Sequence, residues 1–352
     1  MLGVQQIAVT ESQFSDSTST LVSRWSRWSV FVVFAASVFL TITFRSVLPS
    51  SFRLNESSDY AVSYEPVARN ILLGRGFTRG NENLATEYPP GYPLLLAGTF
   101  AVCSFLGVPE ETGVSSISVF GMGLVSVFIF LLTRQLWGVV PALISALMWM
   151  TYPFALWLTK QPSSEIPYMV VLYGGLCLFW YALVRRISGG VYFLCGLLFG
   201  VAMLIRPAAV GIALVLSVII WFGRREVSVR LRCLMITMLL LGNLAVVLPW
   251  EAWVYAKTGQ VILLSTNGAR GMRDGLTFAV SSKGYREDIN VSPDVARVME
   301  DILAQADQIN TVGQVSSAMA REFRSHPAAV AKLSVMKIAR SWYGTDSGRR
   351  ES

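Results

Sequence analysis

The sequence predicts an all-α polytopic membrane protein with about seven transmembrane helices. Of its 352 residues, 53% are hydrophobic and only 14% are charged, whereas soluble domains carry about 25% charged residues. The apolar residues form runs that approach the ~20 residues needed to cross a bilayer. Arginines gather at alternate ends of these runs, which is typical of helices that cross in alternate directions.

The same composition argues against several other classes of protein. The net charge of +7 comes from basic residues that flank apolar runs, so we expect no nucleic-acid partner. The four cysteines lie in apolar stretches without paired or metal-like spacing, which indicates buried thiols. His326 is the single histidine, and this argues against a Ser-His-Asp hydrolase and against most zinc sites.

The chain is predicted to begin on the cytoplasmic side. Residues 1–27 are polar and rich in Ser and Thr at their start, which is typical of a tail without fixed structure. Arg24 and Arg27 precede the first predicted span, Trp28–Phe44, and positive charge at that end keeps it in the cytoplasm. No small-residue cleavage site follows the run, so we expect a retained helix.

A large first loop, residues 49–113, is therefore predicted on the extracytoplasmic side. Its centre, Asn55–Gly98, is polar, acidic and rich in turns, and we interpret it as a catalytic loop. A helix is expected over Tyr60–Leu73, ended by Gly74.

The apolar segment Tyr92–Val108 is predicted to be a juxtamembrane helix of this loop. If it crossed the bilayer, Glu110 and Glu111 would lie inside and Arg134 would lie outside, and every later basic cluster would invert. The other expected spans are Val114–Thr133, Leu136–Leu158, Ile166–Val184, Ser188–Ile205, Ala208–Phe222 and Cys233–Trp250.

Residues 28–250 thus form the predicted transmembrane core, and residues 251–352 form an extracytoplasmic C-terminal segment. In that segment we expect a helix near Val295–Asp307. A basic amphipathic helix is expected over Pro327–Trp342, of the kind that lies on a membrane surface.

Two carboxylates are the candidates for chemistry. Asp59 lies just beyond the first span, where a carboxylate can accept a proton from an acceptor hydroxyl while a lipid-borne donor approaches from the membrane. From its position alone, Asp59 fits better as a solvated loop residue or as the N-cap of the Tyr60–Leu73 helix. Glu165 follows Pro162-Ser163-Ser164 in the second outer loop. It is either a carboxylate stabilised by the dipole of the next helix or a contact to substrate or metal.

The cations supply candidates for binding an anionic substrate. Arg206 lies on the outer side between two apolar helices, where ionisable residues are usually functional, and phosphate is the natural partner of a guanidinium. Lys160 and Arg270 could add positive charge to the same anion, although Arg270 could also be a solvated loop residue. Arg69, beside the first-loop helix, and Tyr88, in the Tyr-Pro-Pro-Gly-Tyr-Pro turn, complete the expected substrate-binding set.

The order of these segments resembles the GT-C superfamily of membrane glycosyltransferases, near the protein O-mannosyltransferases and the bacterial lipid A aminoarabinose transferases. The similar stretches run roughly from Asp59 to Gly271. They are SDYAVSYEPVARNILLGRGF, EYPPGYPLLLAG, RQLWG, QPSSEIPYMVVL, GLLFGVAMLIRP and LPWEAWVYAKTGQVILLSTNGARG.

The resemblance implies an inverting transfer of a sugar from a polyprenyl-phosphate donor on the outer face of the membrane. It implies that Asp59 is the catalytic base and that Glu165 contacts substrate. The sequence departs from the family in one position, because Tyr64 comes five residues after Asp59 rather than four, and Glu65 is therefore the fallback base. Relatives also usually continue with further helices, so we consider a short form, a truncated product or a split enzyme with a partner subunit.

The sequence therefore predicts a glycosyltransferase of the hexosyl or pentosyl class that uses a polyprenyl-phosphate-linked sugar and a lipid, glycan or protein acceptor. We expect a multi-pass protein of the bacterial inner membrane, with its active site toward the periplasm or exterior. No cofactor is required by these residues, although Asp59 and Glu165 could hold Mg²⁺ or Mn²⁺. The alternatives are a non-catalytic or split-subunit relative, or a lipid or sugar transporter (flippase).

Overall fold

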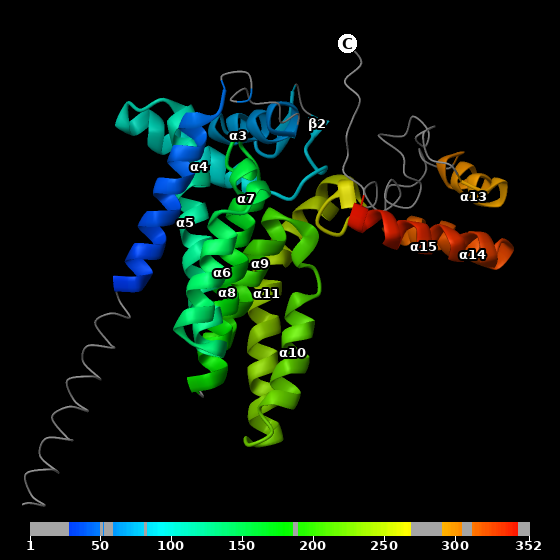
Figure 1. The fold of residues 1–352 in the computed structure, drawn as a ribbon. Helices are drawn as coiled ribbons and strands as arrows, with labels where there is room; N and C mark the ends of the chain where they lie inside the picture. Colours follow the sequence, from blue (N-terminus) through cyan, green and yellow to red (C-terminus); the bar gives the residue numbers. More distant parts are fainter. Residues whose placement is uncertain are drawn as a thin grey trace, which may run out of the picture. The chain divides into compact units, whose positions relative to one another are not determined.

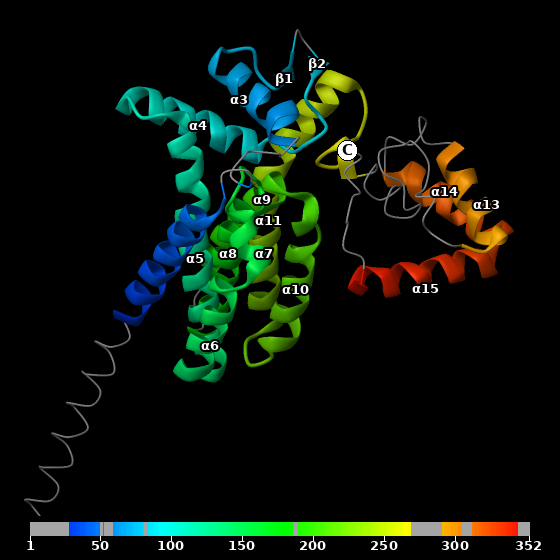
Figure 2. The same cartoon turned by 45° about the horizontal axis from the view of Figure 1, so that its top comes forward.

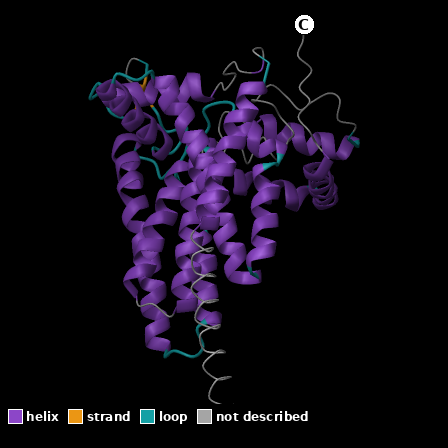
Figure 3. Cartoon of the chain, turned by 60° about the vertical axis from the view of Figure 1, so that its left-hand side comes forward, coloured by secondary structure: helices purple, strands orange, loops and turns teal. Residues whose placement is uncertain are grey.

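The computed structural model describes residues 28–49, 52, 59–80, 83–185, 189–268, 291–304 and 312–343. They belong to two compact units. The membrane unit comprises Met1–Ala85 and Pro89–Pro249, and the C-terminal unit comprises Thr86–Tyr88 and Trp250–Ser352. Helices account for nearly all of the regular structure in the described residues (Figure 3), with one two-stranded sheet.

Four described helices are long and apolar enough to cross a membrane. They are Trp28–Val47, Glu110–Trp137 (α5), Glu165–Arg185 (α8) and Val229–Thr258 (α11). Shorter apolar helices cover Gly91–Leu106 (α4), Val139–Met150 (α6), Gly189–Ile205 (α9) and Ile212–Gly223 (α10). The predicted class, an all-α polytopic membrane protein, is confirmed, and the count of seven spans stays a prediction.

The long helices of the membrane unit form a bundle in which α5 packs against α6 and α8, and α8 packs against α9 (Figure 1). The α5–α6 connection is a single residue, Gly138, with φ +89°. This left-handed conformation costs little only for glycine. A buried cluster of the described residues joins α8, α9, α10 and α11 and includes Phe179, Tyr192, Phe199 and Leu239.

Two predicted spans are not continuous helices. In Ala208–Phe222, a 3-10 turn, η2 (Pro207–Ala209), is followed by Gly211 with φ +85° before α10 begins at Ile212. Over Leu136–Leu158 we expected one helix, whereas α6 ends at Met150 and a short α7, Pro153–Leu158, follows. Pro153 disfavours helical geometry for the residue before it, and Tyr152 is accordingly extended, with φ −67° and ψ 119°. The break brings Thr159 and the loop after it to the start of α8.

The predicted first-loop helix is also divided. A π-helical turn, η1 (Tyr60–Tyr64), leads into α3 (Glu65–Leu72). The strands β1 (Thr78–Arg79) and β2 (Asn83–Leu84) then pair antiparallel. We did not expect this sheet.

The α4 helix lies across one end of the bundle and does not run along it (Figures 1 and 2). Its contacts are with η1, α3, α5 and α9. This arrangement agrees with the expectation that Tyr92–Val108 is a juxtamembrane helix and not one of the spans.

The C-terminal unit contains the end of α11 and three further helices, α13 (Pro293–Ala304), α14 (Val312–Ser325) and α15 (Pro327–Tyr343). The helices α13 and α15 agree with the two helices expected there, whereas α14 was not predicted. Val295, Val298, Met299 and Ile302 of α13 are buried against Ala329, Val330 and Leu333 of α15.

Candidate functional site

The candidate site lies at the end of the bundle where α8 begins and α9 ends. Its central contact is an ion pair between Glu165 Oε1 and Arg206 Nη1, which are 2.5 Å apart. Both side chains are about one-third exposed (35% and 36%), so the pair is open to a ligand. Ion pairs exposed to this extent contribute about 1 kcal/mol or less to stability.

Local sequence places both partners of this pair. Glu165 is the first residue of α8, where the helix dipole stabilises a carboxylate. Arg206 follows α9 directly and precedes Pro207, which excludes it from the helix; its φ of −145° and ψ of 131° are extended. The guanidinium therefore turns off the end of α9 toward the start of α8.

Two hydroxyl groups complete the cluster. Ser164 Oγ accepts a hydrogen bond of 3.1 Å from Arg206 Nη1 and also shares a hydrogen bond with the hydroxyl of Tyr64. Ser164 is 2% exposed and Tyr64 is 7% exposed. The buried phenol and the ion pair are therefore linked through one serine.

The Tyr64 ring is held by the turn that starts α4. It packs edge-on against Tyr92, with ring centroids 4.9 Å apart. Next to Tyr92, Gly91 lies so close to the end of α9 that a Cβ there would be 2.6 Å from the backbone oxygen of Leu204. Only glycine allows this contact. The turn therefore packs directly against the backbone of Leu204, two residues before Arg206.

Three predicted residues act electrostatically on Tyr64. Burial raises the pKa of its phenol to about 12, and the charges of Asp59 and Glu165 add to this increase while Ser164 and Arg206 oppose it. Asp59 is exposed and precedes η1, and its side chain makes no capping hydrogen bond. The structure thus brings Asp59, Glu165 and Arg206 into range of one neutral phenol.

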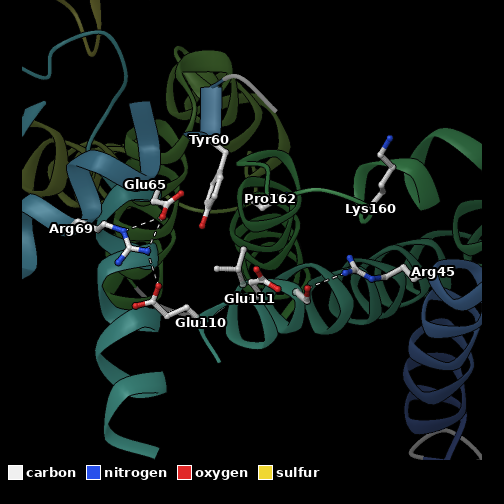
Figure 4. A pocket seen from close by; sticks show the side chains of 10 residues that line it. Arg45, Tyr60, Glu65, Arg69, Glu110, Glu111, Lys160 and Pro162 are labelled. Atoms are coloured by element: carbon white, nitrogen blue, oxygen red, sulfur yellow. Dashed lines mark hydrogen bonds and ion pairs between the residues drawn. The ribbon is translucent and has the colours of Figure 1, made fainter. Parts of the chain in front are cut away.

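A pocket of about 550 Å³ opens beside this cluster in the membrane unit. Its walls come from the end of the first helix, η1, α3, the start of α5 and the loop before α8. The lining residues are Arg45, Tyr60, Glu65, Arg69, Glu110, Glu111, Val114, Ser115, Lys160 and Pro162 (Figure 4).

One part of the pocket wall is a closed charge network. Arg69 Nη2 lies 2.7 Å from Glu65 Oε1 and 2.8 Å from Glu110 Oε2, and its guanidinium carbon is 5.2 Å from the centroid of Phe100. The hydrogen bond to Glu65 is the main reason that the pKa of Arg69 is raised. Arg69 is thus already neutralised by two carboxylates (Figure 4).

Two other cations of the wall have no carboxylate contact among the described residues. Arg45 donates to the backbone oxygen of Thr159 and, through Nη2, to Ser115 Oγ at 2.9 Å. Lys160 is only 8% exposed, and its Nζ lies 4.2 Å from the centroid of the Trp157 ring. These contacts hold both positive charges without neutralising them.

Tyr60 lies between these parts of the wall in Figure 4. Burial is the main cause that raises the pKa of Tyr60 to about 12, and Glu65, Glu110 and Glu111 raise it further, against a lowering by Arg69. Its phenol is therefore protonated at neutral pH and can donate or accept a hydrogen bond.

The predicted site residues fall into two groups and two separate residues. The charges of Asp59, Glu165 and Arg206 act on Tyr64, whereas Lys160, Arg69 and the fallback acid Glu65 line the pocket. Tyr88 is half-buried in the C-terminal unit. Arg270 lies outside the described residues.

Several residues of this region were not predicted as site residues, among them Tyr60, Tyr64, Arg45, Glu110 and Ser164. Ser164 alone had a local signal, since a serine directly before an acidic helix start is a typical N-cap. The others depend on contacts between segments that are distant in the chain.

The described residues contain no group of three or more His, Cys, Asp or Glu side chains that could hold a metal ion. Asp59 and Glu165, the pair considered as metal ligands, therefore lack a third ligand of these types in the part of the chain that the structure covers. The requirement for Mg²⁺ or Mn²⁺ stays untested.

Residues 87–253 match the family model described as dolichyl-phosphate-mannose-protein mannosyltransferase. The match covers slightly less than half of the 352 residues. It confirms the resemblance to GT-C membrane glycosyltransferases that use polyprenyl-phosphate-linked sugars. Lys160, Glu165 and Arg206 lie within the matched residues, whereas Asp59 and Arg69 precede them. The curated proteins and the solved structures gave no match.

Proposed function

We propose that this protein transfers a sugar from a polyprenyl-phosphate donor to an acceptor hydroxyl, on the extracytoplasmic side of the membrane and with inversion at the anomeric carbon. The match to the mannosyltransferase family supports the donor class and the reaction type. The observation that carries the proposal is the ion pair of Arg206 Nη1 with Glu165 Oε1 at 2.5 Å, which Ser164 links to Tyr64. The charge of Asp59 acts on the same Tyr64 phenol.

Asp59 is the proposed catalytic base. The acceptor hydroxyl gives its proton to the Asp59 carboxylate while its oxygen forms a bond to the anomeric carbon. The bond from that carbon to the phosphate oxygen breaks in the same step, and the polyprenyl phosphate leaves with the electron pair. A single displacement of this kind inverts the configuration. The exposed Asp59, which has no capping bond, is free to meet an acceptor.

Arg206 is proposed to offset the negative charge that grows on the departing phosphate. Its Nη1 is engaged by Glu165 and Ser164, and a guanidinium carries five N–H donors, so further donors remain for an anion. In this proposal Glu165 has two functions, since it orients the guanidinium and contacts the substrate.

The extracytoplasmic location of the site rests on the charge pattern of the helices. Arg134 and Arg185 are placed near the ends of α5 and α8, while Glu165 and Glu110 are at the starts of these helices. By the positive-inside tendency, the ends with the arginines face the cytoplasm and the site faces the exterior or periplasm. We further propose that the protein lies in a bacterial inner membrane and that its acceptor is a lipid, a glycan or a protein. A partner subunit is part of the same proposal.

The test is a transfer assay with a panel of radiolabelled polyprenyl-phosphate sugars, using full-length protein in proteoliposomes. Wild type should transfer label from at least one donor, and Asp59→Asn should lower turnover by about 10²–10⁴ while donor binding stays. Glu300→Gln, an exposed acid of α13, is the matched control and should remain active. Full activity of Asp59→Asn would refute this base, and a folded, inserted wild type inactive with every donor would favour the non-catalytic or transporter alternatives.

A further inference from the structure

We propose that the pocket beside the catalytic cluster binds the phosphate group of the polyprenyl-phosphate ligand through Arg45 and Lys160. The proposal rests on the proposed function for the choice of ligand. It assigns to the ground-state phosphate two cations other than Arg206, one of which, Arg45, was not among the sequence candidates.

The first argument is charge. Arg69 contacts two carboxylates within 2.8 Å, and Arg206 contacts one, so each is at least partly neutralised. Among the described residues, Arg45 contacts only a backbone oxygen and a serine hydroxyl, and the Lys160 side chain contacts only aromatic rings. Within the part of the chain that the structure describes, these two are therefore the pocket cations without a carboxylate contact, and their charge is available for an external anion.

The second argument is burial. Lys160 is 8% exposed, and a buried lysine without an acidic partner is costly. Its Nζ lies 4.2 Å from the Trp157 ring centroid and 5.9 Å from that of Phe52, and cation–π contacts offset this cost only in part. A phosphate within reach of the flexible lysine stem would supply the missing counter-charge.

The third argument is that the two cations are joined through the chain. Arg45 donates to the oxygen of Thr159, the residue directly before Lys160. The guanidinium and the lysine backbone therefore belong to one patch of the pocket wall. In Figure 4, Arg45 and Lys160 lie away from the group formed by Glu65, Arg69 and Glu110.

The fourth argument is position along the first helix. Arg45 lies in the last turn of Trp28–Val47, a helix long and apolar enough to cross the bilayer. The phosphate of a membrane-anchored lipid lies at the interfacial depth where such a helix ends. A pocket of about 550 Å³ is within the range of small-molecule sites and leaves space for a sugar next to the phosphate.

The remaining wall suits the sugar. Glu65, Glu110 and Glu111 offer carboxylate oxygens, and Tyr60 offers a neutral phenol. Carboxylates accept hydrogen bonds from hydroxyl groups but repel phosphate. The orientation that follows places the phosphate toward Arg45 and Lys160 and the sugar hydroxyls toward the acidic residues.

The experiment measures binding of polyprenyl monophosphate, a sugar-free probe, to the full-length protein in nanodiscs of phosphatidylcholine. We expect Lys160→Met and Arg45→Gln each to weaken binding at least about tenfold, the effect of losing one charge-assisted contact. Lys160→Arg should retain binding. The matched control is Arg75→Gln, an exposed cation after α3, which should bind as wild type does.

Arg45 also connects the first helix to Thr159 and Ser115 through hydrogen bonds, so Arg45→Gln could fail to fold. Arg45→Lys, which keeps the positive charge, is therefore included as a second variant. Unchanged binding by folded Lys160→Met would overturn the proposal. A second arm adds phosphatidylglycerol to the nanodiscs, and equal competition by this lipid would overturn the assignment to the polyprenyl ligand. If binding depends on Lys160 but the protein transfers no sugar from any donor, only the proposed enzyme function is contradicted. If Lys160→Met transfers sugar normally and its KM for the donor is unchanged, only this inference is contradicted.

Discussion

Arg206 Nη1 and Glu165 Oε1 lie 2.5 Å apart, which joins the cation that follows α9 to the acid that begins α8. The roles expected from the sequence, phosphate binding for Arg206 and substrate contact for Glu165, therefore fall on one ion pair, in which we expect the carboxylate to orient the guanidinium. Ser164 extends this unit to Tyr64. The pair therefore couples two helices to the first loop at the point where the reaction is proposed.

Coupling between these two residues is the first prediction. Glu165→Gln and Arg206→Gln should each lower turnover, and the double variant should be about as active as the weaker single variant, because either change disrupts the same unit. The free energy of unfolding should fall by about 1 kcal/mol or less in each single variant. Transfer assays and denaturant unfolding in detergent measure the two effects.

The control for this cycle is the exposed pair Asp294–Lys332 of the C-terminal unit, with Nζ and Oδ2 2.7 Å apart. Its single and double variants should leave turnover unchanged. Additive losses in the Glu165–Arg206 cycle would show that the two residues act independently.

The contact between Gly91 and α9 gives the second prediction. Gly91→Ala places a Cβ 2.6 Å from the backbone oxygen of Leu204. Relief of this clash would require the backbone of Leu204 or of Gly91 to shift. We expect a loss of about 1–3 kcal/mol in the free energy of unfolding together with reduced turnover, since Arg206 follows two residues later.

A matched control lies on the same helix. Gly98 has open space around its Cα, so Gly98→Ala should increase stability by about 0.5–1 kcal/mol and keep activity. Thermal unfolding of both variants provides the comparison. Equal stability of Gly91→Ala and wild type would mean that the turn is not fixed by this contact.

The helices could be predicted because each rests on a local pattern. The apolar run that gives α8 and the Arg206-Pro207 stop of α9 are visible in sequence, and so is the basic helix α15. The break before Pro153 was missed because an apolar run hides a helix interruption. Of the candidate site, Arg206 was proposed because it is a cation between two apolar helices on the outer side, and Asp59 and Glu165 were proposed from their places in the predicted outer loops. Their roles stay predictions.

The rest of the site depends on contacts that no local pattern contains. Arg45 acts on Thr159, which is 114 residues away in the chain, and Tyr64 meets Ser164 only after α8 and η1 are packed. Arg69 was chosen as a substrate contact, yet two carboxylates already hold it. A sequence shows which residues carry charge, whereas packing decides which charges remain unpaired.

The third prediction concerns Asp294 in α13. Its hydrogen bond with Lys332 is the main cause that lowers its pKa from 3.8 to about 2. The ionised carboxylate stabilises the folded state above the unfolded pKa, and this contribution is lost as the pH falls from about 4 toward about 2. Hydrogen exchange of α13 in the full-length protein should accelerate over that range. Asp294→Asn should show a flatter pH profile, and Glu300→Gln should behave as wild type; an identical profile for all three proteins would contradict the assignment.

The fourth prediction follows from the burial of Tyr64, which raises its pKa from 10.0 to about 12. The neutral phenol favours the folded state fully below pH 10, and this contribution is lost as the pH rises from about 10 to about 12. Tyr64→Phe should lower the free energy of unfolding by about 1 kcal/mol at pH 8 through the lost hydrogen bond to Ser164. This difference in stability from wild type should shrink above pH 10.

Thermal unfolding between pH 8 and 11 measures this trend, and tyrosinate absorbance measures the ionisation of the phenol directly. Folded wild type and Tyr64→Phe should have the same tyrosinate absorbance up to about pH 10, because Tyr64 is still protonated there. An extra tyrosinate in wild type near pH 9 would mean that the phenol is exposed and that Asp59, Glu165 and Arg206 do not enclose a neutral hydroxyl.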